Sequence, residues 1–292
     1  MKPAPFDYAA PASLAEAVKL LAAADGEGKI LAGGQSLMPL LNMRLARPKL
    51  LVDVARIPGL DYVREEKGEI AIGAMARQRT LERAGFAQRM QPLLHEAILN
   101  IAHPQNRNQG TVCGSLAHAD PAAELPAVAV ALGATFKVMG ERGERVIPAH
   151  EYFVSYLTTS MEPNEILAEV RFPAQPARTG WAFDEVARRH GDFAMAGVSL
   201  TTTLDGSGAC SAAAIVLFGV GSTPVRASAA EAVLIGNKPT ADLFATAAAK
   251  VDESITEPLD DVHATGAYRR HVAQALTRRA LPHAFARAEG RP

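Results

Sequence analysis

The sequence is short of cysteine, and this scarcity limits the cofactors that the chain can hold by itself. Its 292 residues contain two cysteines, Cys113 and Cys210, and no Cys-x-x-Cys pair. A disulfide framework, an iron–sulfur cluster and a zinc site with several thiolate ligands are therefore excluded for this chain. His103 and His118 show no metal-ligand spacing, so the sequence predicts no metal site. Redox chemistry here requires an organic cofactor or a cofactor on another subunit.

The sequence also lacks a surplus of charge and any long apolar run. Lysine and arginine total 30 against 31 acidic residues, which gives no indication of a nucleic-acid or membrane-binding surface. No segment approaches the roughly 20 apolar residues of a membrane span, and the first residues lack the apolar core of a signal peptide. These observations predict a cytoplasmic protein. Because 48% of the residues are hydrophobic, the chain can bury a full core, and two domains are expected.

The first 55 residues are predicted to form a small parallel β-α-β unit. A capping box that begins at Ser13 starts a helix, and short apolar strands are predicted over 29–31 and 49–54. The segment 32–36 then lies at the carboxyl end of a strand. Open α/β sheets bind their ligands at that end.

In the rest of the chain, the pattern of predicted strands and helices changes at a proline-rich linker, 173–176. Before it we expect strands over 69–73 and 166–172, a hairpin over 135–138 and 145–147, helices over 92–102 and 122–132, and a helix capped by Thr80. After it we expect three antiparallel strands, 181–188, 195–204 and 210–220, then helices over 227–234, 240–251 and 268–280. Strands followed by helices indicate an α+β domain.

Residues 32–36 read Ala-Gly-Gly-Gln-Ser and follow a predicted strand directly. Glycine allows positive φ and a close approach of the backbone to a ligand. Successive free N–H groups in such a loop form an anion-binding nest, and the Ser36 hydroxyl can add a donor. A diphosphate requires a neutral, close-range donor set of this kind. The alternative is a plain tight turn between a strand and a helix.

A second small-residue loop, 110–115, repeats this pattern of glycines and hydroxyls. Two such loops in one domain favour a cradle for a phosphate-bearing cofactor. Cys113 is either a redox thiol or, as we favour, a small filler beside the cofactor. Asp120 is suited to cap the following helix with Pro121 at its first position, and Glu124 can accept hydrogen bonds from nucleotide sugar hydroxyls.

Other motifs indicate less chemistry. The Gly-x-Gly pairs at 206–208 and 219–221 complete no dinucleotide-binding fingerprint, and the sequence has neither a Walker lysine motif nor Gly-x-Ser-x-Gly. The serines also lack an evident His/Asp partnership, so none of these motifs identifies a catalytic side chain. Residues 188–193 form a charged turn between two strands, which is either a solvated loop or a contact to a ligand or partner.

Several ordered motifs resemble those of the FAD-binding medium subunits of molybdenum hydroxylases. This family includes the medium subunits of carbon monoxide dehydrogenase and quinoline oxidoreductase and the central part of xanthine dehydrogenase. The motifs lie at 31–45, 110–124, 166–173, 191–194, 223–226 and 268–270, so the resemblance covers essentially the whole chain.

The resemblance implies an α+β architecture of two domains. An N-terminal FAD-binding fold of the PCMH or vanillyl-alcohol-oxidase type, with two subdomains, would precede a three-stranded antiparallel sheet with a helical bundle. The implied boundaries are 1–175 for the FAD-binding domain, with subdomains of about 1–57 and 58–175, and 178–290 for the flavoprotein C-terminal domain.

The resemblance also implies FAD on this chain, with molybdopterin and [2Fe–2S] clusters on partner subunits. A large subunit would oxidise the substrate, a small subunit would carry electrons, and this chain would pass them to an acceptor. The expected assembly is a heterotrimer, doubled to (αβγ)2. The implied cofactor-binding residues are Lys29, Leu31, Ala32, Gly33, Gly34, Gln35, Ser36, Leu37, Gly110, Thr111, Cys113, Gly114, Ser115, Ala119, Asp120, Glu124 and Leu167.

Two residues depart from the family pattern. Cys113 stands where many relatives have glycine, and Gln35 replaces a histidine associated with the carbon monoxide enzymes, which favours an N-heteroaromatic or aldehyde substrate. Two other functions stay open: a stand-alone flavin oxidoreductase of the same fold, and a flavin-free partner-binding module. The sequence leaves the acceptor open among NAD, oxygen, a quinone and a cytochrome.

Overall fold

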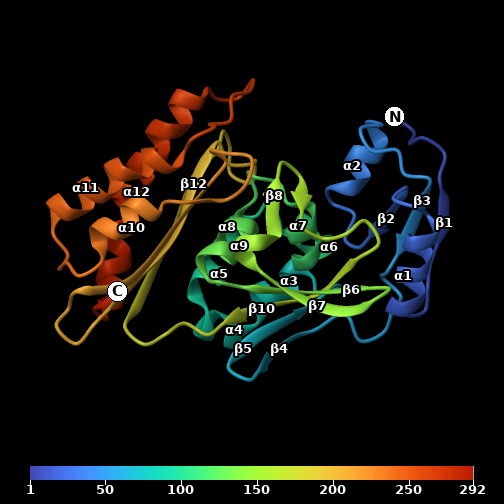
Figure 1. The fold of residues 1–292 in the computed structure, drawn as a ribbon, viewed down its shortest axis with the longest axis horizontal. Helices are drawn as coiled ribbons and strands as arrows, with labels where there is room; N and C mark the ends of the chain where they lie inside the picture. The colour runs from blue at the N-terminus through green and yellow to red at the C-terminus, as the bar shows by residue number, and fades with distance from the viewer. Residues whose placement is uncertain (292) are drawn as a thin grey trace.

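The computed structural model describes residues 1–291, and three main sheets succeed one another along its long axis (Figure 1). A small N-terminal sheet lies at one end, a five-stranded sheet with several helices lies in the middle, and the C-terminal sheet lies at the other end with its helices. Within residues 1–291, no helix is long and apolar enough to cross a membrane.

The N-terminal sheet is wholly parallel, in the order β1-β3-β2, which confirms the predicted β-α-β unit. Its elements are β1 (Asp7–Ala9), α1 (Leu14–Ala23), β2 (Gly28–Leu31), α2 (Leu37–Asn42) and β3 (Leu50–Asp53). Ser13 caps α1, because its hydroxyl accepts a hydrogen bond from the Glu16 N–H at 3.2 Å. The first strand was not predicted. The loop 32–36 leaves the carboxyl end of β2, as expected.

The middle sheet is antiparallel and has the order β4-β5-β10-β6-β7. Its strands are β4 (Val63–Glu66), β5 (Glu69–Gly73), β6 (Thr135–Gly140), β7 (Gly143–Pro148) and β10 (Ile166–Pro173), and a separate hairpin joins β8 (Phe153–Ser155) to β9 (Thr158–Thr159). Its helices are α3 (Gln78–Arg83), α4 (Gly85–Met90), α5 (Pro92–Asn100), α6 (Pro104–Gln109), α7 (Val112–His118), α8 (Glu124–Ala131) and α9 (Ala149–Tyr152). Thr80 lies inside α3 rather than capping it, because the helix already begins at Gln78.

The C-terminal part contains four antiparallel strands rather than the three expected, in the order β11-β12-β13-β14. They are β11 (Thr179–Val186), β12 (Ala196–Leu204), β13 (Cys210–Phe218) and the two-residue β14 (Val225–Arg226). The helices are α10 (Ser228–Leu234), α11 (Ala241–Lys250), the 3-10 turn η1 (Val251–Ser254) and α12 (Gly266–Ala288). The last helix is longer than predicted, and its start is capped by Thr265, whose hydroxyl accepts from the Tyr268 N–H at 3.2 Å.

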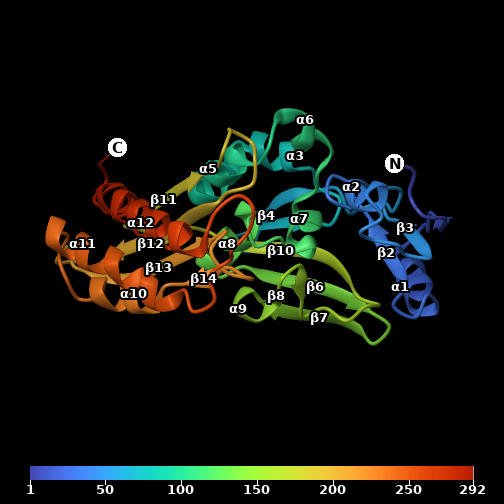
Figure 2. The same ribbon diagram turned by 90° about the horizontal axis from the view of Figure 1, so that it is seen from above.

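Both faces of this C-terminal sheet are buried, and β11 shows why (Figure 2). Gly180 and Asp184 face α12, where Asp184 binds Arg279. Trp181 and Phe183 face the middle part: Phe183 belongs to its apolar core, and the partly buried Trp181 packs against that core. Successive strand residues point to opposite faces of a sheet. The odd-numbered residues of β11 therefore pack against the core of the middle part, and the even-numbered residues pack against the core that contains α12.

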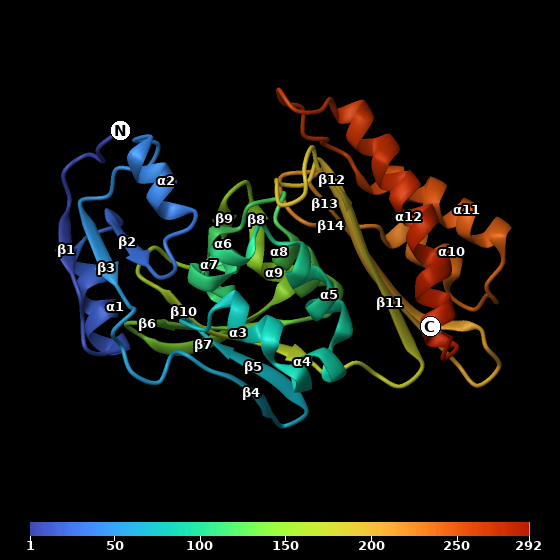
Figure 3. The same ribbon diagram turned by 180° about the vertical axis from the view of Figure 1, so that it is seen from behind.

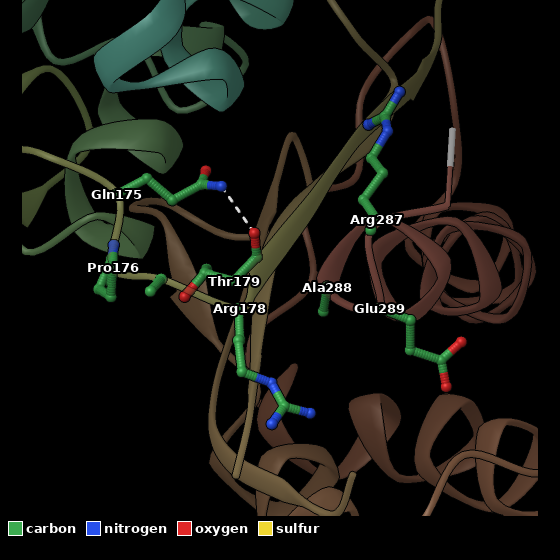
Figure 4. Close-up of a pocket in the computed structure, with 9 residues that line it drawn as sticks. Gln175, Pro176, Arg178, Thr179, Arg287, Ala288 and Glu289 are labelled. Carbon is green, nitrogen blue, oxygen red and sulfur yellow. Dashed lines mark hydrogen bonds between the residues drawn. The ribbon is translucent and has the colours of Figure 1, made fainter. Parts of the chain in front are cut away.

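The middle and C-terminal parts meet along α5, α8 and the odd-numbered face of β11 (Figure 3). Glu96 of α5 accepts hydrogen bonds from Trp181 Nε1 at 2.8 Å and from Arg287 Nη1 at 2.9 Å. The connection between β10 and β11 borders a hollow of about 540 Å³ at the C-terminal end of α12, and there Gln175 Nε2 donates to Thr179 O at 2.6 Å (Figure 4).

Candidate functional site

The two glycine-bearing segments predicted to bind a cofactor meet in the structure. A Cβ on Gly33 would lie 2.5 Å from Gln109 O and 2.8 Å from Gly110 Cα, so only glycine allows these two backbones to lie so close. Gln35 Oε1 accepts a hydrogen bond from Asn106 Nδ2 at 3.2 Å. The N-terminal sheet and α6 therefore join at this point, and Figure 2 shows α2 beside α6 and α7.

The first segment presents an unbroken series of main-chain donors. Within residues 1–291, no hydrogen-bond acceptor is found for the N–H groups of residues 33–37. Gly34 has a φ of +72°, in the left-handed region that favours glycine, and it turns the chain into α2. Ser36 makes no capping hydrogen bond, so its hydroxyl is free to bind a ligand. Successive N–H groups of this kind form a nest for an anion.

The second segment, 110–115, was predicted to be a loop, but most of it forms the first turn of a helix. Helix α7 begins at Val112, and the Thr111 hydroxyl accepts the Gly114 N–H at 3.0 Å. A Cβ on Gly114 would lie 2.5 Å from that hydroxyl, so the cap requires glycine there. In the part of the chain that the structure describes, the N–H groups of Thr111 and Cys113 have no acceptor. They are the donors that this segment offers.

The Cys113 side chain points away from these donors and into the core. Its Sγ donates to Ile72 O at 3.6 Å, and complete burial raises the pKa of the thiol. Only its main chain is therefore available to a ligand. The interpretation as a small filler agrees with this geometry better than the redox thiol does.

Both cysteines are buried, and the expected consequence is an absence of reactive thiols in the folded protein. Burial also raises the pKa of Cys210 to about 11, which keeps it protonated at neutral pH. Titration with Ellman's reagent should detect no fast-reacting thiol in buffer and both thiols in denaturant. A fast reaction of Cys113 in the folded chain would contradict the packing described here.

Residues 119–124 follow α7 and form a turn before α8. Ala119 ends α7 with a φ of +53°, and the Asp120 Oδ1 accepts the Ala122 N–H at 2.9 Å. The next helix begins only at Glu124, with Ala123 as its N-cap. The prediction that Asp120 caps a helix with Pro121 at the first position was wrong, because the Asp120 side chain closes its own local turn first.

A buried and a half-buried carboxyl group lie at the junction of the middle and C-terminal parts. Glu124 is 6% exposed, and burial with the nearby charge of Asp120 raises its pKa to about 7. Glu185 lies on the same face of β11 as Trp181, and burial with the charge of Glu124 raises its pKa to about 8. One Glu185 oxygen is buried with no partner among residues 1–291. Glu185 was not predicted as a site residue. The only indication in the sequence is an acidic residue at a position of β11 whose side chain faces the middle part rather than α12.

The remaining predicted site residues flank these segments. Lys29 and Leu31 lie on β2. Burial lowers the pKa of His118 at the end of α7, and the nearby charge of Lys29 lowers it further. His118 Nε2 lies 4.0 Å from an Asp120 oxygen. Leu167 is buried in β10 beside a bulge, in the core that also holds α7. The structure therefore brings β2 close to the end of α7, where Lys29 and His118 lie, and the 119–124 turn follows α7 directly.

Comparisons with known proteins agree with this arrangement. The family described as the FAD binding domain in molybdopterin dehydrogenase matches residues 4–175, and the CO dehydrogenase flavoprotein C-terminal domain matches residues 181–284. The 6-hydroxypseudooxynicotine dehydrogenase complex subunit alpha of Paenarthrobacter nicotinovorans is 45% identical over 99% of this chain and 97% of that protein. Caffeine dehydrogenase subunit beta of Pseudomonas sp. (strain CBB1) is 41% identical over 97% of this chain and 96% of that protein.

A solved structure resembles the whole fold. It is the carbon monoxide dehydrogenase of Hydrogenophaga pseudoflava that lacks the Mo-pyranopterin moiety of the molybdenum cofactor. The superposed chain is 40% identical, with a TM-score of 0.94, and the match covers 98% of this chain and 99% of that one.

The fold, the free N–H groups of segment 33–37 and of Thr111 and Cys113, and the two family matches define a flavoprotein component of an oxidoreductase, with an FAD-binding domain on this chain. The chain belongs to the family of FAD-binding medium subunits of molybdenum hydroxylases. Its fold class agrees with the prediction, apart from the fourth C-terminal strand.

Proposed function

We propose that this chain is the electron-transfer subunit of a heterotrimeric molybdenum-containing hydroxylase or dehydrogenase. It takes electrons from [2Fe–2S] clusters of a small partner subunit and passes them to an external acceptor. The main support is the series of free N–H groups at 33–37, held by Gly33 against residues 109–111. FAD supplies a centre that exchanges electrons one or two at a time.

The residues at and around the place where segments 33–37 and 109–113 meet suit the different parts of FAD by their chemistry. The N–H groups of 33–37 and the hydroxyl of Ser36 are neutral donors suited to a diphosphate. Thr111 and Cys113 add two main-chain donors from the facing segment. Asp120 and the buried Glu124 offer acceptors for ribose or ribityl hydroxyls and for a flavin N–H. Leu37 and Leu167 supply apolar surface for the ring.

We also propose the domain boundaries 1–175 and 178–290, with subdomains of about 1–57 and 58–175. The three main sheets support this division, because one ends at Asp53, the next runs from Val63 to Pro173, and the last begins at Thr179. The flavin would then contact both subdomains, through 32–37 and through 110–124.

The substrate of the complex is proposed to be an N-heteroaromatic compound or an aldehyde. Two of the relatives reported above are named for 6-hydroxypseudooxynicotine and for caffeine, which contain nitrogen heterocycles. Substrate binding would take place on the large molybdopterin subunit, in a complex of (αβγ)2 composition. No side chain of this chain is assigned an acid or base role in substrate oxidation.

Replacing Gly33 by alanine should weaken FAD binding at least about 100-fold, because a 2.5 Å contact with Gln109 O forces the two segments apart. Visible absorption after incubation with FAD and gel filtration measures the loss. Gly85→Ala is the matched control, since a Cβ there meets only the end of the Arg89 side chain at 3.7 Å.

Three outcomes of this experiment separate the candidate functions. Flavin retained by the parent and by Gly85→Ala, and lost by Gly33→Ala, supports the proposal. Flavin retained by the parent with turnover of a substrate in the absence of partner subunits would favour the stand-alone oxidoreductase. A parent that retains no flavin, alone or purified with its partner subunits, would reject FAD binding and leave the partner-binding module.

A further inference from the structure

Arg269 of α12 is a buried cation that binds main-chain oxygens at the ends of two strands. It is 3% exposed, and its Nη1 donates to Met195 O at 2.5 Å and to Gly219 O at 2.7 Å. Its Nη2 donates to Asp261 Oδ2 at 2.7 Å. A buried guanidinium must make such hydrogen bonds to offset the loss of hydration. The side chain therefore fixes the start of β12 and the end of β13 to α12.

Gly219 extends this connection from the C-terminal part into the middle part. While its carbonyl accepts from Arg269, its N–H donates to Pro121 O at 2.7 Å. Gly219 has a φ of +70°, and a Cβ there would lie 2.9 Å from Ala194 O. These constraints hold a single residue, Gly219, against both Arg269 and the 119–124 turn, through the two peptide groups that flank its Cα. Hydrogen bonds thus run without a break from α12 to the residue next to Asp120.

The 119–124 turn needs such an external support. Its own hydrogen bonds are local: the Ala122 N–H donates to Asp120 Oδ1, and the Ala123 N–H donates to the Asp120 carbonyl at 3.1 Å. Ala119 adopts a positive φ although it is not glycine, which stores a small amount of backbone strain. A strained turn with local bonds keeps one conformation only if neighbouring structure holds it.

We propose that Arg269 is a positioning residue for the flavin site, because it holds the 119–124 turn in place through Gly219. The inference rests on the proposed role of Asp120 and Glu124 as cofactor contacts. It assigns the C-terminal part a share in forming the site, although none of its own side chains was predicted to bind the cofactor.

The test compares Arg269→Met with Arg279→Met, a matched control on the same helix. Arg279 makes two 2.6 Å hydrogen bonds to Asp184, and among residues 1–291 it forms no hydrogen bond with Met195, Gly219 or Pro121. In the chain without FAD, amide exchange at 119–123 should accelerate at least about tenfold in Arg269→Met and stay within about twofold in Arg279→Met. The FAD dissociation constant should rise at least about tenfold in Arg269→Met alone.

Arg269→Lys serves as the second variant, because an ammonium group can still bind one of the two carbonyl oxygens. It should restore part of the exchange protection and part of the affinity, so the test does not depend on Arg269→Met remaining folded. Equal exchange at 119–123 in Arg269→Lys, Arg279→Met and the parent would overturn the positioning role. If the parent itself binds no FAD, the proposed function fails, while the exchange measurement still decides the role of Arg269.

Discussion

Replacing Gly180 by alanine should lower the free energy of unfolding by about 3 kcal/mol, although it adds a single methyl group. Gly180 lies on the face of β11 that packs against α12. A Cβ there would overlap Ala284 O and lie 2.5 Å from Ala288 N, both main-chain atoms of a helix. No rotamer change can relieve such a contact, so the helix must move away from the sheet. The core between β11 and α12 would then lose its close packing.

Gly206→Ala provides the control for this prediction. Gly206 lies in the turn between β12 and β13, with no heavy atom within 4 Å of a Cβ built on it and no positive φ. Its replacement should change the stability by less than about 0.5 kcal/mol. Urea unfolding followed by circular dichroism and tryptophan fluorescence compares both variants with the parent. An unchanged midpoint for Gly180→Ala would show that α12 lies farther from β11 than described.

The elements that could be predicted from the sequence are those whose apolar pattern is complete over a few residues. The strands β2, β3 and β5 are short apolar runs beside turn residues, and the long strands β11 to β13 alternate or run apolar. The missed elements lack this signal. Strand β1 is mostly exposed, β4 is a charged edge strand, and α6 (Pro104–Gln109) contains no apolar side chain except its proline. Tertiary contacts decide the structure of such segments.

The part of the candidate site that could be predicted from the sequence is the part where the backbone geometry requires glycine. Close backbone approach at Gly33 and positive φ at Gly34 both require glycine, so the first segment is visible in the sequence. The second segment was wrongly expected to be a loop, because its cap pairs Thr111 with the Gly114 N–H and lacks the acid of a capping box. The contributions of Glu185 and Arg269 depend on how distant strands and helices meet. Arg269 lies in the family motif at 268–270, but neither this motif nor any other local pattern encodes the contacts that Arg269 makes.

The second large effect concerns pH. Burial and the charge of Glu124 raise the pKa of Glu185 from its ordinary 4.5 to about 8, and Asp184, which binds Arg279, adds to the rise. Between pH 4.5 and pH 8 the unfolded chain has released this proton, while the folded chain still holds it. The folded state therefore binds more protons, and the free energy of unfolding falls as the pH rises through this window. The stabilisation from this group is fully present below pH 4.5 and is lost above pH 8.

Glu185→Gln should therefore be more stable than the parent by about 2–4 kcal/mol at pH 8.5, and nearly equal to it at pH 4.5. Glutamine keeps the shape of the protonated side chain and cannot ionise. Urea midpoints of the FAD-free chain across this pH range measure the difference, with Glu65→Gln on the exposed side of β4 as the control. Glu185 is a cleaner probe than Glu124, which belongs to the proposed cofactor site. If the stability difference did not grow with pH, water or a cation would have to reach Glu185 in the folded chain, and the junction would be more open than the packing of α8 on the C-terminal sheet indicates.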